Sequence, residues 1–384
     1  MRFHRGPTAR PGEAIPDRET EAVVPKTVFV PNRLIGDAER IFTEAGLEVV
    51  YGLPLELRGF GGSPEVQQQR REAFDPGLAA HLAGAHALQA IGLGAQLPVT
   101  AELLDAAPQL EVVFVPSAGT DVIDLDAATE RGIAVVNAAG NNYVSVSEHA
   151  VGLMLSLTRL IARTDRVAHA DQRSVSTMAL GTPGIVHGKT VGVIGFGFIG
   201  REVARICTTA FGMRALAYDP YANPIEAERL GVELVDDLAD LLGASDVVSM
   251  HSPLTPTTRN LLGRAQLAAM KPTAVLLNTS RGGTVDTEAL VEALQEGRIA
   301  GAGLDVTEPE PLPEGHPLYS MENVVLTPHS GGSAPEMVAR AGAMSASDTV
   351  RALRGDRPTN LVNPQVWPAF SARLGGSVTV GASS

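Results

Sequence analysis

The stretch VGVIGFGFIG, residues 191–200, decides the fold of this chain. An apolar run that has the character of a buried strand leads directly into Gly195, Gly197 and Gly200, and a helix-forming stretch, REVARICTTAF, follows at residues 201–211. A strand that ends in a glycine-rich turn and opens a helix is typical of a doubly wound domain, in which helices cover both faces of a parallel sheet.

The same segment predicts a dinucleotide site. Gly195 permits the tight turn, Gly197 lets backbone N–H groups approach a pyrophosphate, and Gly200 lets helix and strand pack closely. Asp219 ends the next strand, LAYD, where a carboxylate accepts hydrogen bonds from both ribose hydroxyls and repels a 2′-phosphate. A structural turn followed by a helix-capping Asp is the alternative. The combination of strand, glycines, helix and Asp favours NAD as the cofactor over NADP.

Other apolar runs extend this pattern along the chain. Six of them predict the strands of the second half of the chain: KTVGVIGFG, MRALAYD, DVVSMH, AVLLNTS, AGAGLDV and NVVLTPH. A strand TVFVP beginning at Thr27, and the runs HALQAIGLG and LEVVFVPSAG, predict βαβ units in the first half, with Thr100 as the N-cap of the helix TAELLDAA. We also predict one long helix from about Val146 to Ala168 and another over PEMVARAGAMSASDTVRALRG.

Composition limits the classes of partner. The chain has 384 residues, 44% of them hydrophobic and 19% charged, and its formal net charge of −13 disfavours a nucleic-acid partner. No apolar run approaches the about 18 residues that suggest a membrane span, and residues 1–25 lack the apolar centre of a signal peptide, so we expect a loose extension there and a cytoplasmic protein. The single cysteine, Cys207, is expected to be buried on a helix.

Unusual polar side chains follow three of the predicted strands. Arg281, Glu310 and His329 all come shortly after strand ends, which is the edge where open α/β sheets bind ligands. Hydride transfer to a 2-oxo acid needs a cation for the carboxylate and carbonyl, a group that titrates near neutrality, and a partner that tunes this group. Arg281, His329 and Glu310 fit these three roles, with the Glu310 carboxylate raising the pKa of the imidazole. The alternatives are a surface cation, a solvated acid and a structural histidine. No metal site is predicted.

The chain resembles the D-isomer-specific 2-hydroxyacid dehydrogenase family over residues 87–364. The motifs that carry this resemblance are AGTDVIDLDAATERGIAVVNAAGNN, SVSEHAVGLML, the glycine fingerprint, HSPLTPTTRNLL, MKPTAVLLNTSRGG, AGLDVTEPEP and LTPHSGG. The resemblance implies that Arg281, Glu310 and His329 are the catalytic set. It also implies that Asp305 holds the nicotinamide carboxamide.

The resemblance assigns further contacts. Phe198 and Ile199 would cradle the pyrophosphate, and the adenosine side would be lined by Ser252, Pro253 and Thr258. The nicotinamide end would be faced by Thr279, Ser280 and Arg281, and the cofactor would also be contacted by His329, Gly331 and Gly332. The substrate carboxylate would meet Ser117, Ala118 and Gly119, with Asn142 nearby. Taken without the resemblance, these last four residues are better explained as a strand-to-helix turn and a capping Asn. His149 and His251 are expected to have structural positions, at the hinge helix and at a strand end beside the cofactor.

The resemblance also implies the domain organisation. A Rossmann cofactor domain, residues 146–330, would be inserted into a flavodoxin-like substrate domain formed by residues 26–145 plus 331–384, so that the whole is an α/β protein with two doubly wound parallel sheets. A homodimer joined through the cofactor domain is implied as well.

The chain departs from branches of the family in ways that bear on the substrate. The phosphoglycerate branch carries arginines where Gly94 and Gln96 stand here, so D-3-phosphoglycerate is disfavoured. The formate dehydrogenase branch has Gln at the position of Glu310, so a reaction that forms a hydroxyl is favoured over formate oxidation. NAD(H)-sensing corepressors of the same family remain an alternative of another class.

Overall fold

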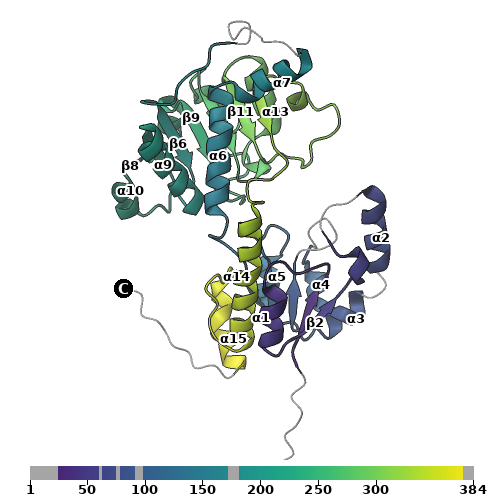
Figure 1. Cartoon of the computed structure of the whole chain (residues 1–384). Coiled ribbons are helices and arrows are strands. Elements are labelled where there is room, and N and C mark those ends of the chain that lie inside the picture. Colours follow the sequence, from purple (N-terminus) through teal and green to yellow (C-terminus); the bar gives the residue numbers. More distant parts are fainter. Residues whose placement is uncertain (1–24, 60–62, 75–77, 91–97, 172–180, 375–384) are drawn as a thin grey trace, which may run out of the picture.

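Two parallel sheets, each with helices on both faces, make up the structure, a computed structural model (Figure 1). It describes residues 25–59, 63–74, 78–90, 98–171 and 181–374. Most of the predicted N-terminal extension, residues 1–24, and both Gly94 and Gln96 therefore lie outside the described residues.

The larger sheet has seven strands in the order β12-β11-β10-β9-β6-β7-β8, and every neighbouring pair is parallel. The strands are β6 Thr190–Ile194, β7 Arg214–Tyr218, β8 Val232–Leu234, β9 Val247–Met250, β10 Val275–Asn278, β11 Gly301–Leu304 and β12 Val324–Leu326. The chain runs outward from β6 to β8 and then returns to form β9 on the other side of β6. This order is that of the Rossmann fold, and its crevice lies between the carboxyl ends of β6 and β9.

The smaller sheet has five parallel strands in the order β2-β1-β3-β4-β5. They are β1 Thr27–Val30, β2 Glu48–Tyr51, β3 Ala87–Gln89, β4 Val112–Phe114 and β5 Ala134–Val136. This is the flavodoxin-like order. The predicted fold class, two doubly wound parallel sheets of these two types, is confirmed.

Helices bury both faces of each sheet, which explains why most strands are almost wholly apolar. The larger sheet packs against α6 Tyr143–Thr158 and α9 Phe198–Phe211 on one face, and against α11 Leu238–Ala244, α12 Arg264–Ala269 and α13 Thr287–Gln295 on the other. The smaller sheet packs against α3 Leu78–Ala83, α4 Ala101–Asp105 and α5 Leu125–Glu130 on one face, and against α1 Ala38–Glu44, α14 Pro335–Leu353 and α15 Trp367–Arg373 on the other. The other α-helices of the described residues are α2 Pro64–Phe74, α7 Ile161–Asp171 and α10 Pro224–Leu230.

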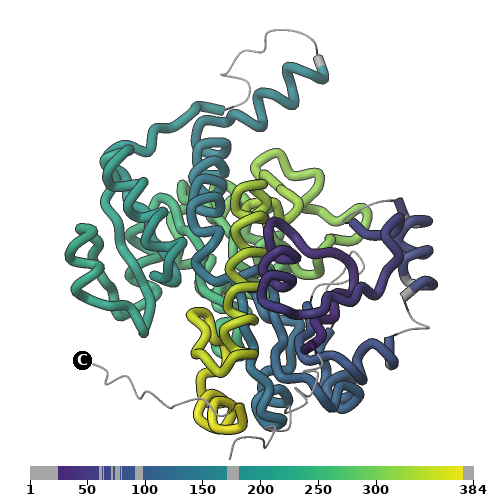
Figure 2. The backbone as a smooth tube through the Cα atoms, turned by 60° about the horizontal axis from the view of Figure 1, so that its bottom comes forward, coloured from purple at the N-terminus to yellow at the C-terminus, as the bar shows by residue number. Residues whose placement is uncertain are grey.

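The C-terminal helices return to the sheet built from the N-terminal half. Residues Ala346, Val350 and Leu353 of α14 are buried in one core with Val28 of β1 and Phe114 of β4. Figure 1 shows α6 against the larger sheet in the upper part of the molecule and α14 against the smaller sheet in the lower part, and in Figure 2 the yellow-green α14 lies beside the purple α1. This packing supports an inserted cofactor domain, whose boundaries at residues 146 and 330 stay a prediction.

The predicted long helix from Val146 to Ala168 is wrong, because the chain forms two helices there. The first, α6, ends at Thr158, and α7 begins at Ile161. Leu160, between them, has a φ of +56°, a left-handed conformation that cannot continue a right-handed helix. The carbonyl of Thr158 accepts a hydrogen bond from the N–H of Gly184, so a loop distant in sequence closes the end of α6.

Other differences from the sequence prediction are local. Three strands, β2, β5 and β8, were not among the predicted ones, and α2 was not among the predicted helices. Thr100 does cap α4, since its hydroxyl accepts a hydrogen bond from the N–H of Leu103 at 3.4 Å. Within the described ranges, no helix combines the length and the apolar character needed to cross a lipid bilayer.

Candidate active site

The glycine turn lies at the carboxyl end of β6, in the crevice. Gly195 has a φ of +92°, and a Cβ there would lie 2.6 Å from the N atom of Ser252, so the turn leaves no room for a side chain. A Cβ on Gly200 would overlap the carbonyl oxygen of Gly195, which lets α9 pack closely against the turn. At Gly197, by contrast, no atom of the described residues lies within 4 Å of an added Cβ. Gly197 is the N-cap of α9 and provides no side-chain cap, so the open space faces an uncapped helix N-terminus that suits a pyrophosphate.

Asp219 lies beside this turn. Its carboxylate accepts hydrogen bonds from the N–H of Phe196 at 2.7 Å and from the N–H of Tyr221 at 2.8 Å, one on each oxygen. These bonds fix the side chain next to the glycines, and each oxygen keeps a lone pair for a further donor. The arrangement fits the ribose of NAD.

Other residues of the predicted cofactor site lie at the start of α9 and after β9. Phe198 and Ile199 form the first turn of α9, and the Phe198 ring, 58% exposed, packs against Gly140. Ser252 is buried after β9, and the carbonyl of Pro253 accepts a hydrogen bond from the Thr258 hydroxyl at 2.6 Å. Their contacts with a cofactor stay predictions.

The turn after β10 carries Arg281. Asn278, which is 1% exposed, holds this turn: its Oδ1 accepts hydrogen bonds from the N–H and hydroxyl of Ser280, and its Nδ2 donates to the carbonyl of Arg281. Thr279 is buried, and its hydroxyl lies 3.5 Å from Nδ1 of His251. The backbone at Arg281 is therefore fixed by hydrogen bonds with the buried side chain of Asn278.

The guanidinium of Arg281 reaches the segment Ser117–Gly119, which follows β4 of the smaller sheet. A Cβ added to Gly119 would overlap the Nη2 atom of Arg281. Among the described residues, the backbone N–H groups of this segment donate to no acceptor, whereas the carbonyl of Ala118 accepts a hydrogen bond from Nδ2 of Asn137 at 2.8 Å. The predicted substrate segment and the predicted cation therefore meet, with free backbone donors beside them.

Asp305, after β11, organises the turn that carries His329. It is 2% exposed, and its carboxylate accepts hydrogen bonds from the hydroxyl of Thr327 and from the N–H groups of Ser330 and Gly331. Burial alone would raise the pKa of Asp305, but these hydrogen bonds outweigh it and hold the pKa below its usual value. Nε2 of His149 lies 2.9 Å from Oγ1 of Thr327, so the hinge helix α6 also contacts this turn.

His329 and Glu310 are paired. Nδ1 of His329 lies 2.7 Å from Oε1 of Glu310, and both side chains are about half exposed. The hydrogen bond with Glu310 raises the pKa of His329 against the opposing effects of burial and of the Arg281 charge. Burial would raise the pKa of Glu310, but the hydrogen bond with His329 holds it below its usual value. The pair therefore favours an imidazolium beside a carboxylate.

Asn142 lies beside the glycines that follow His329. Asn142 is the N-cap residue of α6, and a Cβ added to Gly332 would lie 2.8 Å from its Nδ2 atom. The structure thus brings residues of α6 to the 329–332 turn. Within the described residues, no cluster of three or more His, Cys, Asp or Glu side chains is arranged to hold a metal ion.

Two other titratable residues have structural positions. His251, directly after β9, is only partly exposed, and burial lowers its pKa to about 3, so it is neutral at physiological pH. Cys207 is buried on α9, as predicted, and burial raises its pKa to about 12, so it is not a reactive thiolate.

The sequence did not identify Asp121 as a functional residue. Its Oδ2 atom lies 2.9 Å from both Nε and Nη2 of Arg281. The only signal for it was its place in the quoted motif AGTDVIDLD, directly after the substrate segment.

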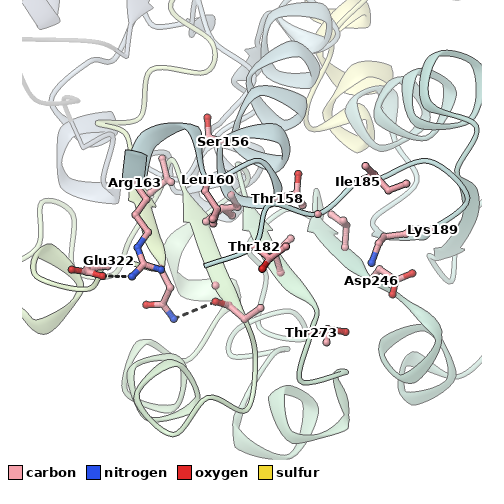
Figure 3. A pocket seen from close by; sticks show the side chains of 18 residues that line it. Ser156, Thr158, Leu160, Arg163, Thr182, Ile185, Lys189, Asp246, Thr273 and Glu322 are labelled. Atoms are coloured by element: carbon pink, nitrogen blue, oxygen red, sulfur yellow. Dashed lines mark hydrogen bonds and ion pairs between the residues drawn. The ribbon is translucent and has the colours of Figure 1, made fainter. Parts of the chain in front are cut away.

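A cavity of about 360 Å³ lies outside this site. It lies at the opposite edge of the larger sheet, where β9, β10 and β11 begin, and is lined by Val247, Val275 and Gly301 among others. Figure 3 shows the ion pair between Arg163 and Glu322 on its wall. Ligands of open α/β sheets bind at the carboxyl ends of the strands, so we place no catalytic role in this cavity.

Comparison with known proteins agrees with this architecture. Residues 151–331 match the model of the NAD-binding domain of the D-isomer specific 2-hydroxyacid dehydrogenases. The chain is 43% identical over 272 residues to a glyoxylate reductase of Korarchaeum cryptofilum, and the aligned region covers 70% of this chain and 81% of that protein. It is 42% identical over 268 residues to a D-3-phosphoglycerate dehydrogenase of Methanocaldococcus jannaschii, and this aligned region covers 69% of this chain but only 50% of that protein.

Among solved structures, the holo form of D-mandelate dehydrogenase from Rhodotorula graminis superposes with a TM-score of 0.76 at 28% identity, covering 88% of this chain and 98% of that one. A protein of Thermus thermophilus, TT0316, superposes with a TM-score of 0.73 at 36% identity and covers 88% and 99% of the two chains. The chain spans about half the length of the phosphoglycerate dehydrogenases that it matches. On the sequence match and the fold together, this chain belongs to the D-isomer specific 2-hydroxyacid dehydrogenase family.

Proposed function

We propose that this protein is an NAD-dependent oxidoreductase that interconverts a small 2-oxo acid and the corresponding D-2-hydroxy acid. The observation that carries the proposal is the 2.7 Å contact between His329 and Glu310. The charge of Arg281 also acts on both of these side chains, so the guanidinium lies near the pair. An acid–base pair next to a cation, at the carboxyl edge of a sheet with a dinucleotide turn, is what a carbonyl reduction requires.

Each side chain has a distinct role in the proposed reaction. Arg281 and the free N–H groups of Ser117–Gly119 bind the substrate carboxylate and orient the carbonyl. When bound, NADH supplies the hydride that forms the new C2–H bond as the carbonyl π bond breaks. The Nε2–H of the His329 imidazolium gives its proton to the carbonyl oxygen, which becomes the hydroxyl. Glu310 keeps His329 protonated before this step and stabilises its charge.

The cofactor assignment rests on the residues around the glycine turn. The open space at Gly197 and the uncapped N-terminus of α9 would hold the pyrophosphate. Asp219 would accept hydrogen bonds from the ribose and disfavour a 2′-phosphate, so NAD is proposed over NADP. Asp305 would also hold the nicotinamide carboxamide, in addition to fixing the turn before His329.

The substrate class is proposed to be a small, unphosphorylated 2-oxo acid. Glu310, rather than a glutamine, supports a reaction in which a hydroxyl forms. Gly94 and Gln96 argue against a phosphate group on the substrate. We further propose that the protein is cytoplasmic, has no nucleic-acid partner and forms a homodimer through the cofactor domain. Light scattering coupled to size-exclusion chromatography measures its mass in solution and so tests the dimer.

A substrate panel tests the proposal. NADH oxidation is measured with glyoxylate, hydroxypyruvate, pyruvate and phenylpyruvate, and NAD⁺ reduction with formate and with D-3-phosphoglycerate. The expected result is turnover of at least one of the four 2-oxo acids, with a rate that falls about 100-fold or more in Arg281→Ala but stays measurable. Turnover of formate alone would replace the proposal by formate oxidation, and tight NADH binding without any turnover would favour an NAD(H)-sensing protein.

A further inference from the structure

The Arg281 guanidinium is held by an acid from the opposite sheet. Asp121 belongs to the loop between β4 and α5, whereas Arg281 follows β10 of the larger sheet. One carboxylate oxygen of Asp121 lies 2.9 Å from Nε and 2.9 Å from Nη2, a side-on contact with the guanidinium. This ion pair joins the two halves of the molecule at the substrate segment.

The loop that carries Asp121 is fixed on both sides. Ile123, which is 7% exposed, forms an isolated parallel bridge with Val99, and Asp124 caps α5 by accepting a hydrogen bond from the N–H of Ala127 at 2.9 Å. The N–H of Ile123 also donates to the carbonyl of Thr120. Asp121 is therefore mounted on an ordered turn, which makes it a suitable anchor.

The pairing leaves the end of the guanidinium accessible. Nε and Nη2 face Asp121, and Nη1 donates to the carbonyl of Ser280 at 2.7 Å. Each terminal nitrogen carries two N–H groups, so one on Nη1 and one on Nη2 remain without an acceptor among the described residues. These two nitrogens form the edge that receives a carboxylate in a bidentate manner.

We propose that Asp121 is a positioning residue, which holds Arg281 side-on against Gly119 so that the substrate carboxylate binds end-on beside it. The inference rests on the proposed role of Arg281 as the substrate cation. Asp121 stays in place when the substrate binds, because the substrate carboxylate uses the N–H groups of Nη1 and Nη2 that neither Asp121 nor the Ser280 carbonyl occupies. A flexible arginine is thereby restricted to one orientation, and a misplacement of about 1 Å in such a clamp can cost about 100-fold in rate.

The experiment measures kcat and KM for the best 2-oxo acid of the panel in Asp121→Asn, Asp121→Ala, Arg281→Ala and the double variant Asp121→Ala/Arg281→Ala. NADH affinity and the melting temperature are measured for each protein. Glu233→Ala is the matched control, because Glu233 pairs with Arg214 at 2.6 Å on an exposed surface that is not in the crevice. We expect Asp121→Asn and Asp121→Ala to raise KM about tenfold or more, with a smaller fall in kcat and with NADH affinity unchanged.

The double variant separates positioning from an independent effect. If Asp121 acts through Arg281, then Asp121→Ala changes kcat/KM less than about threefold once Arg281 is already alanine. An equal loss in both backgrounds would overturn the proposal, and so would a KM like that of the wild type in both single variants. A lower KM in Asp121→Asn would also overturn it, since Asp121 would then compete with the substrate. Full activity of Arg281→Ala would instead remove the proposed function itself.

Discussion

The imidazole of His329 and the carboxylate of Glu310 form a hydrogen bond of 2.7 Å although they come from different loops, one after β12 and one after β11. Asp305 fixes the turn that carries His329. The φ of His329 is +53°, and its backbone N–H donates a hydrogen bond to the backbone carbonyl of Asp305, which helps to maintain this conformation. The side-chain pair is therefore mounted on backbone that is held independently of it.

The pair of His329 and Glu310 is expected to determine how kcat/KM depends on pH. Reduction needs the imidazolium, so kcat/KM for the 2-oxo acid should be constant at low pH and fall as the pH rises through the pKa of His329, which lies above its ordinary value of 6.5. In Glu310→Gln the charge is lost while a hydrogen-bond acceptor remains, so burial and Arg281 lower the pKa of His329. The fall in kcat/KM should therefore move to lower pH.

The reverse reaction supplies the control for this prediction. Oxidation of the hydroxy acid needs the neutral imidazole, so its kcat/KM should rise with pH through the same pKa. If Glu310→Gln leaves both pH profiles where they are in the wild type, Glu310 does not tune His329.

Removing the imidazole should have a larger effect. We expect His329→Ala to lower kcat by about 100-fold or more, the scale for loss of a positioned general acid, while NADH affinity changes less than about threefold. His316→Ala is the matched control, because His316 only caps a short 3₁₀ turn at residues 317–319. Steady-state rates and NADH fluorescence titrations provide the two measurements, and a His329→Ala enzyme with wild-type kcat would exclude His329 as the acid.

The sequence was sufficient where the determinant is local. The strand, three glycines and helix of residues 191–211 lie within one continuous stretch, so the pattern specifies the turn without knowledge of the rest of the chain. The same holds for His329 and Glu310, because the carboxyl ends of parallel strands always share one edge. The strand order of the larger sheet brought them together as predicted.

The sequence was insufficient where the determinant is a tertiary contact. The break between α6 and α7 depends on a hydrogen bond from Gly184 to Thr158, and apolar periodicity carries no information about it. The pairing of Asp121 with Arg281 depends on how two sheets face each other, 160 positions apart in the chain. Asp305 was expected at the cofactor, and its hydrogen bonds with the backbone N–H groups of Ser330 and Gly331 were not foreseen because backbone donors leave no trace in the sequence.

Gly119 provides a test of the position of Arg281. A Cβ at this residue would overlap the guanidinium end of a flexible side chain, not the backbone, so Gly119→Ala should displace Arg281 without unfolding the protein. We expect kcat/KM for the 2-oxo acid to fall about tenfold or more and the melting temperature to change by less than about 2 °C, a surface-type effect on stability. Gly84→Ala is the control, because no atom of the described residues lies within 4 Å of its added Cβ. Unchanged kinetics in Gly119→Ala would mean that Arg281 does not act at this segment.

Asp219 is expected to decide the choice of cofactor. In Asp219→Ala the ribose loses its charged acceptor, and the hydrogen bonds from the N–H groups of Phe196 and Tyr221 are lost as well. A hydrogen bond to a charged group contributes about 1.5–3 kcal/mol, so the ratio of kcat/KM with NADH to that with NADPH should fall at least about tenfold. Asp219→Asn removes the charge and keeps one oxygen, which can accept one of the two backbone hydrogen bonds, so it should loosen the glycine turn less than Asp219→Ala does. Asp237→Asn, at the exposed N-cap of α11, should leave the ratio unchanged. If the ratio of kcat/KM with NADH to that with NADPH is the same in the wild type and in both Asp219 variants, the carboxylate does not recognise the ribose.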